Sequence, residues 1–395
     1  MAKPVYAFEE ADSKKRMLLG GKGAGLSEMT RLKLPVPPGF TITTEVCNKY
    51  YDNNKKLPKD LMPAVMKNII KMEKKTGKKW NSTTNPLLVS VRSGAAISMP
   101  GMMDTILNLG LNEKTVEGFA EQTKNPRFSW DSYRRFIQLF GKVVFGVNDE
   151  KFDHVLDTAK NAQGVTDDSK LDVESLKTIV SEYKKICETH TKRKFPDSPK
   201  EQLELSIEAV FKSWMGERAI VYREKNGITK DIANGTAVNV VTMVFGNMGD
   251  DSATGVVFTR NGHNGKKELE GEYLINAQGE DVVAGVRTGQ NIELLKKDMP
   301  KSYKELYNAC SKLEKHYKEP QDIEFTVEQG KFYLLQTRTA KMSAGALVKT
   351  SVDMVKEKLI NKDKALLRIP AQQLEALLHR TMDESKVKDF KQLAK

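Results

Sequence analysis

Cysteine and histidine, the residues of thiol and zinc chemistry, are scarce and scattered in this sequence. Only three cysteines occur, Cys47, Cys187 and Cys310, and they lie far apart in the chain. They form neither the spacing of a metal site nor a disulfide framework, which agrees with a reducing compartment. The five histidines contain no H-x-x-x-H spacing, so the sequence argues against a zinc site.

Long apolar runs and blocks of like charge are also missing. No run is long enough to cross a membrane, and the opening MAKPVYAFEE has no apolar signal core, so we expect no membrane association. The net charge of +12 comes from lysines that are spread along the chain. This distribution indicates a solvated basic surface and not a nucleic-acid arm, although it can attract anionic ligands such as nucleotides.

The chain of 395 residues is long enough for two or three structural units. Short apolar strands alternate with amphipathic helices at the start, helical spacing dominates the middle, and strands return before a helical end. This order predicts an α+β fold. We expect four parts: residues 1–112 together with 214–240, a helical insertion at 113–213, a second strand-rich part at 241–342, and a helical tail at 343–395.

The glycine-rich stretch GGKGAG, residues 20–25, is the first candidate binding element. It places Lys22 in a loop that leads into a predicted helix. Glycines let backbone N–H groups approach an anion closely, and a helix N-terminus adds partial positive charge. The spacing is neither that of a P-loop nor that of a dinucleotide fingerprint. An ordinary strand–helix connection is the alternative.

A strand that ends in an arginine and a loop of small residues is the second candidate. The stretch LLVSVRSGAAISMPGMMDTILNLGL, residues 87–111, carries Arg92 at the end of its strand. A guanidinium there can hold a phosphate group through two parallel hydrogen bonds. The loop 93–103 has the composition of a lid over a polyphosphate. The alternative is a structural arginine followed by a surface loop.

The stretch QDIEFTVEQGKFYLLQTR, which begins at residue 321, predicts a hairpin with a polar face. A three-residue loop, QGK, would place Glu324 opposite Gln336 and Asp322 opposite Arg338, with each pair about 5 Å apart. A two-residue loop would scatter these side chains over both faces. Acid and amide oxygens suit Mg²⁺, so we interpret this face as a magnesium site. A solvated face with one cross-strand ion pair is the alternative.

Two further segments contain candidate contacts without a decisive pattern. YLINAQGEDVVAGVRT, residues 273–288, predicts a buried strand followed by Glu280, Asp281 and Arg287 around glycines. These side chains either form a turn or contact a ribose or a metal. VNVVTMVFGN, residues 238–247, predicts an apolar strand that is either core alone or a source of main-chain contacts to a flat base.

Together these motifs resemble the N-terminal nucleotide-binding part of the pyruvate, phosphate dikinase family. The resemblance runs from Val5 to about Leu378. Its carriers are LLGGKGAGLSEMT, PPGFTITTE, LLVSVRSGAAISMPGMMDTILNLGLN, NPRFSWDSYRRFIQ, GTAVNVVTMVFGN, GEYLINAQGEDVVAGVRT and DIEFTVEQGKFYLLQTR. The related water dikinase, phosphoenolpyruvate synthase, is an alternative, but it lacks the sequence SMPGMMDTILNLGLN.

The resemblance implies an ATP-grasp fold, in which two α/β lobes enclose ATP in a cleft beside a helical insertion and a helical linker. It implies a phosphotransferase that converts ATP, phosphate and pyruvate into AMP, pyrophosphate and phosphoenolpyruvate. This part would bind ATP with Mg²⁺ and run the nucleotide half-reaction. The implied partners are inorganic phosphate and a histidine on a separate swivelling domain of a homodimeric enzyme. The implied compartment is the cytoplasm, with a glycosome or plastid as the alternative.

The resemblance also assigns roles to individual residues. The triphosphate grip and the stabilisation of the transferring group are expected from Lys22, Arg92 and Arg338. The metal ligands are expected to be Glu324 and Gln336, with Asp322 nearby. Other nucleotide contacts are expected from three places. A closing loop contributes Gly101, Met103 and Asp104, and the main chain beside adenine contributes Met243 and Val244. The cleft wall contributes Glu280 and Asp281, with Arg135 beside them.

One family feature is missing from the sequence. The phosphate-accepting histidine of the family lies in a Thr-Ser-His sequence, and none of the five histidines has that context. We therefore expect an excised or truncated piece that cannot complete the reaction by itself. Two other functions are compatible with the sequence: a non-catalytic nucleotide-binding module, and an ATP-grasp ligase that activates a carboxylate as an acyl phosphate.

Overall fold

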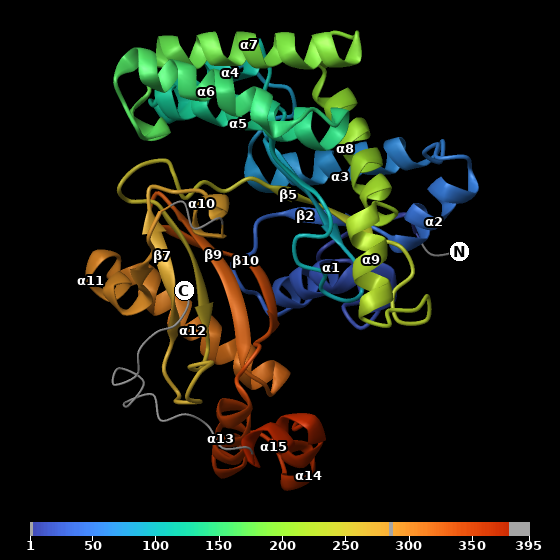
Figure 1. Cartoon of the computed structure of the whole chain (residues 1–395), viewed down its shortest axis with the longest axis vertical. Helices are drawn as coiled ribbons and strands as arrows, with labels where there is room; N and C mark the ends of the chain where they lie inside the picture. The colour runs from blue at the N-terminus through green and yellow to red at the C-terminus, as the bar shows by residue number, and fades with distance from the viewer. Residues whose placement is uncertain (1–2, 284–286, 379–395) are drawn as a thin grey trace, which may run out of the picture.

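The computed structural model describes residues 3–283 and 287–378, which contain two five-stranded antiparallel sheets (Figure 1). The first sheet has the order β1–β2–β5–β3–β4, formed by Val5–Ala7, Gly39–Ile42, Ala237–Thr242, Val89–Gly94 and Thr105–Leu109. The second has the order β10–β9–β6–β7–β8, formed by Lys331–Thr339, Gln321–Glu328, Ala253–Phe258, Glu270–Ile275 and Gln290–Asn291. No helix in these described ranges is long and apolar enough to span a membrane.

Helices surround the two sheets in four groups (Figure 1). Before β3 lie α1 (Arg16–Arg31), α2 (Thr44–Asp52) and α3 (Leu61–Thr76). Between β4 and β5 lie α4 to α9, which are Glu113–Thr123, Pro126–Phe145, Asp149–Gln163, Val173–Thr191, Pro199–Trp214 and Glu217–Lys225. The second sheet carries α10 (Gly279–Val283), α11 (Leu295–Asp298) and α12 (Pro300–Tyr317), and the described chain ends with α13 (Ala344–Lys356), α14 (Lys362–Leu367) and α15 (Ala371–Leu378).

The helical insertion shares one hydrophobic core with the first sheet. Val91 of β3, Phe136 and Phe140 of α5, and Leu203 of α8 belong to the same buried cluster. Apolar residues at helical spacing face inward along these helices, as the sequence predicts. The division of the chain into lobes stays a proposal, and β5 spans residue 240, the proposed boundary between the lobes. The part of the proposed tail beyond residue 378 lies outside the described residues.

Helix α1 contacts both sheets and lies between them. Leu26 and Met29 from its second half are buried in the core of the second sheet, together with Phe325 and Phe332. The first half lies against the end of β3, where the N–H of Gly21 donates to the carbonyl of Ala95 at 2.8 Å. Any group carried by the start of α1 therefore lies between the two sheets.

The hairpin β9–β10 has the predicted pairs but reaches them in a different way. Its loop has two residues, Gln329 and Gly330, both in the left-handed region with φ of 47° and 72°. The loop therefore has two residues and not the three on which the expected pairing was conditional. A bulge between Leu334 and Gln336 shifts the register by one residue, so that Gln336 lies opposite Glu324 and Arg338 opposite Asp322. The bulge restores the single polar face that a two-residue loop alone would have scattered.

A buried ion network attaches α13 to the second sheet. Arg260, two residues after β6, is fully buried and donates to Glu314 of α12 and Glu357 beyond α13 at distances of 2.8 to 3.1 Å. Thr259 donates to the same Glu314 carboxylate at 2.8 Å. Removing one partner of such a network leaves a buried charge without compensation, which costs about 3–5 kcal/mol.

We predict that Arg260→Met lowers the free energy of unfolding by about 3 kcal/mol, because the buried Glu314 carboxylate loses its cation. Urea unfolding followed by circular dichroism measures this change. The matched control is Lys267→Met, which removes an exposed cation from the same Glu357 and should cost less than about 1 kcal/mol. Equal losses for the two variants would contradict a stabilising role of the buried network.

Candidate functional site

A cavity of about 970 Å³ opens between the two sheets and holds most of the predicted phosphate- and metal-binding residues. Its walls come from α1, from the loop between β3 and β4, and from the hairpin β9–β10. The predicted residues that line it are Lys22, Gly101, Met103, Glu324, Gln336 and Arg338. The fold thus brings together three stretches that the sequence analysis treated separately.

Helix α1, which contributes to the cavity wall, is interrupted at Gly20. Gly20 has φ of 69° and ψ of 164° inside α1, a left-handed conformation that favours glycine. A Cβ at this position would lie 1.8 Å from the carbonyl oxygen of Gly94, so the close contact requires glycine. Lys22 therefore lies in the first turn after the break, inside α1, and not in a loop ahead of the helix as predicted from the sequence.

Lys22 lines the cavity, and Arg92, which is not part of its lining, lies close enough to affect the Lys22 ammonium; among the described residues neither cation forms an ion pair. Loss of hydration, together with the positive charges of Arg92 and Arg338, lowers the pKa of Lys22 to about 8, against the opposite effect of Glu324. Arg92 lies near the end of β3, and its Nε is buried without a hydrogen-bond partner in the described part of the chain. An anion between them would supply the missing acceptor and reduce the repulsion.

The hairpin β9–β10 supplies an acidic wall to the same cavity. Glu324 and Gln336 are cross-strand partners, and both line the cavity. The next pair on that face, Asp322 and Arg338, forms an ion pair with an Oδ2–Nε distance of 2.6 Å. Burial raises the pKa of Asp322, although Arg338 opposes this effect. The other carboxylate oxygen of Asp322, Oδ1, is buried and unpartnered among the described residues.

This polar face fits a Mg²⁺ ion. Carboxylate and amide oxygens from Glu324 and Gln336, with the unpartnered oxygen of Asp322, are hard ligands of the kind that Mg²⁺ prefers. Across residues 3–283 and 287–378, no group of three or more His, Cys, Asp and Glu side chains is arranged to hold a metal by itself. A magnesium ion here would therefore need phosphate oxygens and waters as further ligands.

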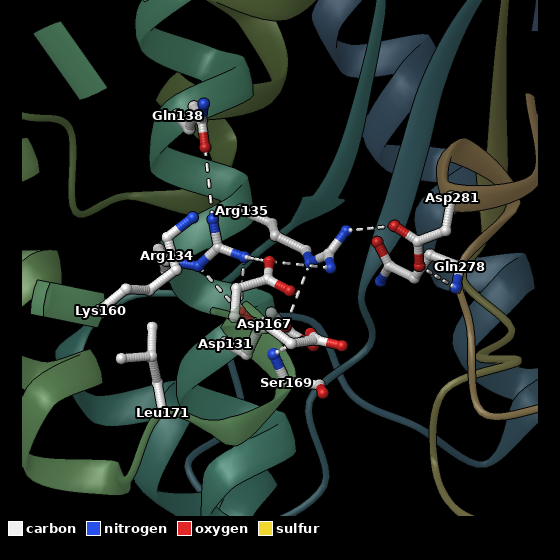
Figure 2. A network of polar contacts seen from close by, with 12 residues as sticks. Asp131, Arg134, Arg135, Gln138, Lys160, Asp167, Ser169, Leu171, Gln278 and Asp281 are labelled. Carbon is white, nitrogen blue, oxygen red and sulfur yellow. Dashed lines mark hydrogen bonds and ion pairs between the residues drawn. The ribbon is translucent and has the colours of Figure 1, made fainter. Parts of the chain in front are cut away.

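Asp281 and Arg135 do not line the cavity but bind each other (Figure 2). Arg135 Nη1 donates to Asp281 Oδ1 at 3.1 Å, and this contact joins α5 to α10. Arg135 also contacts Asp131, which Arg134 holds at 2.8 Å. Although burial opposes it, these two guanidiniums lower the pKa of Asp131 to about 2. Glu280 lies in α10, and its side chain is outside what the structure describes.

Three other predicted contacts, Asp104, Met243 and Val244, also lie outside the cavity lining. Burial raises the pKa of Asp104, whose carboxylate is 3.8 Å from the Arg218 guanidinium. Met243 is buried where the chain leaves β5 for the second sheet, and its N–H donates to the carbonyl of Leu88 at 2.9 Å. The structure thus does not bring these residues into the wall that holds Lys22 and Glu324.

The sequence analysis missed a second group of cavity residues at the meeting of α1 and α12. Glu28 accepts hydrogen bonds from Ser13 and Arg31 and contacts His316. Although burial opposes it, Arg31 and Ser13 lower the pKa of Glu28 to about 2. Arg16 lines the same cavity, and its Nε donates at 2.8 Å to a carbonyl of the β3–β4 loop. No local pattern identifies this group, because its members meet only when α12 approaches α1.

Similarity to known proteins agrees with this geometry. The sequence matches the family described as "Pyruvate phosphate dikinase, AMP/ATP-binding domain" over residues 16–59, 53–304 and 299–359. It is 54% identical over 380 residues to a pyruvate, phosphate dikinase of Entamoeba histolytica, which covers 96% of this chain and 43% of that protein. The corresponding protein of Clostridium symbiosum is 51% identical over 389 residues, covering 98% of this chain and 44% of the relative. The chloroplastic pyruvate, phosphate dikinase 1 of Arabidopsis thaliana is 48% identical over 381 residues, covering 95% and 39%.

The chain therefore spans less than half the length of these curated relatives. The α+β fold and the family resemblance predicted from the motifs are confirmed. The residues matched by the family description include Lys22 and the hairpin in the walls of the cavity, and Arg92 close to it. From its sequence match and its antiparallel two-sheet fold, this chain belongs to the pyruvate, phosphate dikinase family and corresponds to the AMP/ATP-binding domain of that family.

Proposed function

We propose that this chain binds ATP with Mg²⁺ between its two sheets and performs the nucleotide half-reaction of a pyruvate, phosphate dikinase. The observation that carries the proposal is that Lys22 lines one cavity together with the acidic hairpin and has the Arg92 guanidinium close enough to lower its pKa. Lys22 and Arg92 need a bound anion, and Glu324 with Gln336 offers ligands to a divalent ion. A magnesium-bound triphosphate satisfies both requirements.

Each side chain of the cavity has one task in this proposal. Lys22 and Arg92 hold the polyphosphate chain and orient it along α1. Arg338 is held in place by Asp322 and stabilises the negative charge of the phosphoryl group during transfer. Magnesium bound at the hairpin supplies charge neutralisation on the phosphate oxygens. Fixed charges of this kind need no rearrangement when the reaction occurs, which is the main source of catalysis in phosphoryl transfer.

The proposed acceptor is a histidine on a domain outside this chain. Its imidazole nitrogen attacks the β-phosphorus, the bond to the α-phosphate oxygen breaks, and AMP leaves. The terminal phosphoryl group then passes to inorganic phosphate, which yields pyrophosphate and a phosphohistidine. His316 lines the cavity, but its Nε2 contacts the carboxylate of Glu28. That contact favours a structural role for His316 over a role as the acceptor.

We predict that a non-hydrolysable ATP analogue binds the chain in a Mg²⁺-dependent manner, and that Arg92→Ala and Glu324→Ala each weaken binding about tenfold or more. A charge-assisted hydrogen bond contributes about 1.5–3 kcal/mol, which corresponds to that factor. Glu324→Ala should also remove most of the Mg²⁺ dependence. Calorimetric titration with and without Mg²⁺ measures both effects.

The matched controls for this titration are Arg193→Ala and Glu201→Ala. These two residues form an exposed ion pair away from the cavity, so their loss should leave the affinity unchanged. Saturable binding that neither Arg92→Ala nor Glu324→Ala affects would place the nucleotide elsewhere and contradict the proposal.

We also predict that Lys22→Met stabilises the ligand-free chain at pH 7 by roughly 3 °C in melting temperature, and that this gain disappears towards pH 10.5. The pKa of Lys22 is about 8 when folded, below its ordinary 10.5. The folded state therefore carries an unfavourable charge below pH 8, and this cost vanishes as the pH rises through that interval. Thermal unfolding at both pH values tests this, with Lys14→Met at the exposed cavity edge as control. A pH-independent effect of Lys22→Met would contradict the prediction.

A further inference from the structure

The side chain of Gln278 is buried without any partner in the described part of the chain. It is only 4% exposed, and both Nε2 and Oε1 of its amide lack a hydrogen bond. A buried amide that makes no hydrogen bond is costly, and native proteins rarely keep one without a bound group to satisfy it. Figure 2 shows this amide beside α10, directed towards Arg135. None of the roles described above uses Gln278.

Gln278 lies over the same face of the second sheet as the hairpin acids. A Cβ on the next residue, Gly279, would lie 3.9 Å from Thr254 Oγ1. Thr254 and Thr326 are cross-strand partners whose hydroxyl oxygens are 3.3 Å apart. Thr326 is two residues from Glu324, so both side chains emerge on one face, about 7 Å apart along the strand. Neither Thr254 nor Gln278 lines the cavity, but both lie over the face of the sheet from which Glu324 enters it.

This arrangement indicates the direction in which the sugar and base of a bound nucleotide extend from its phosphates. With the phosphates at Lys22 and Glu324, the sugar and base extend either towards Thr254 and Gln278 or past Arg338. The region past Arg338 is the exposed end of the cavity, lined by charged residues such as Glu319. The opposite direction leads to buried groups that lack partners, so the flat base is better placed there.

A second unpartnered group lies next to Gln278. The N–H of Ala277 donates to the carbonyl of Gly246 at 2.9 Å, which brings two segments side by side. The next residues in these segments are Gln278 and Asn247, and Asn247 Oδ1 is also buried without a partner among the described residues. The segment beside Gln278 thus holds a second unsatisfied acceptor, the side-chain oxygen of Asn247.

We propose that Gln278 reads the edge of the nucleotide base and selects adenine over guanine. An amide can donate to a ring nitrogen of adenine and accept from its 6-amino group, which is the pairing that glutamine makes with adenine in other complexes. Guanine presents an oxygen where adenine presents the amino group, so one of the two hydrogen bonds becomes a repulsion. This inference rests on the proposed nucleotide-binding function and assigns its base specificity to one side chain.

The test measures by calorimetry the affinity of the full chain for three ligands: non-hydrolysable analogues of ATP and GTP, and inorganic tripolyphosphate. Gln278→Met has a similar shape and no amide. It should weaken the ATP analogue about tenfold, because a bidentate base contact contributes that much discrimination. It should leave the GTP analogue and tripolyphosphate unchanged. Gln122→Met, at an exposed position of α4, is the matched control and should change nothing.

A second variant distinguishes loss of the amide contact from loss of the folded structure. Gln278→Glu keeps the size but replaces the amide donor by a second acceptor oxygen, which faces the acceptor N7 of adenine and both acceptors, N7 and O6, of guanine. It should therefore weaken both nucleotide analogues more than it weakens tripolyphosphate. An unchanged ratio of ATP to GTP affinity in Gln278→Met, or an equal loss of tripolyphosphate affinity in both variants, would overturn the role of Gln278. Failure of the unsubstituted chain to bind the ATP analogue and tripolyphosphate would instead overturn the proposed function itself.

Discussion

The burial of the Lys22 ammonium beside cationic neighbours is the constraint on which the rest of the site depends. Burial lowers the pKa of Lys22 to about 8, helped by the positive charges of Arg92 and Arg338 and opposed by Glu324. A bound anion removes this cost, and groups with such shifted pKa values cluster at functional sites. Every wall of the cavity contributes to this arrangement. The break at Gly20 sets the first turn of α1 against β3, and the hairpin faces it with carboxylate and amide oxygens.

Helix α1 links the two sheets that form the cavity. Its start lies against the β3–β4 loop, while Leu26 and Met29 are buried in the core of the second sheet. The helix that carries Lys22, the proposed phosphate-binding residue, is therefore positioned by both sheets at once. The ion network of Arg135, Asp131 and Asp281 makes a separate link between the helical insertion and α10 (Figure 2). Together these contacts fix the walls of the cavity from two sides.

Local patterns in the sequence predict the elements of the fold and part of the site. The polar pairs expected across the hairpin are observed, although its loop has two residues and not the three that the pairing assumed. The pairs depend on a bulge at residue 335, and alternation in one strand cannot reveal an extra residue in it. His316, Glu28 and Gln278 escaped sequence analysis for a different reason. Their surroundings come from segments distant in the chain, so no spacing shows that they meet.

The most direct test of the account is the position of a metal. Anomalous diffraction from crystals grown with Mn²⁺ and a non-hydrolysable ATP analogue locates the ion independently of the protein density. The account predicts a single strong peak between Glu324 and Gln336, in contact with phosphate oxygens that Lys22 and Arg92 also bind. Bound nucleotide with the metal elsewhere, or with phosphates that do not reach Lys22, would contradict the claim that these cations and the hairpin form one site.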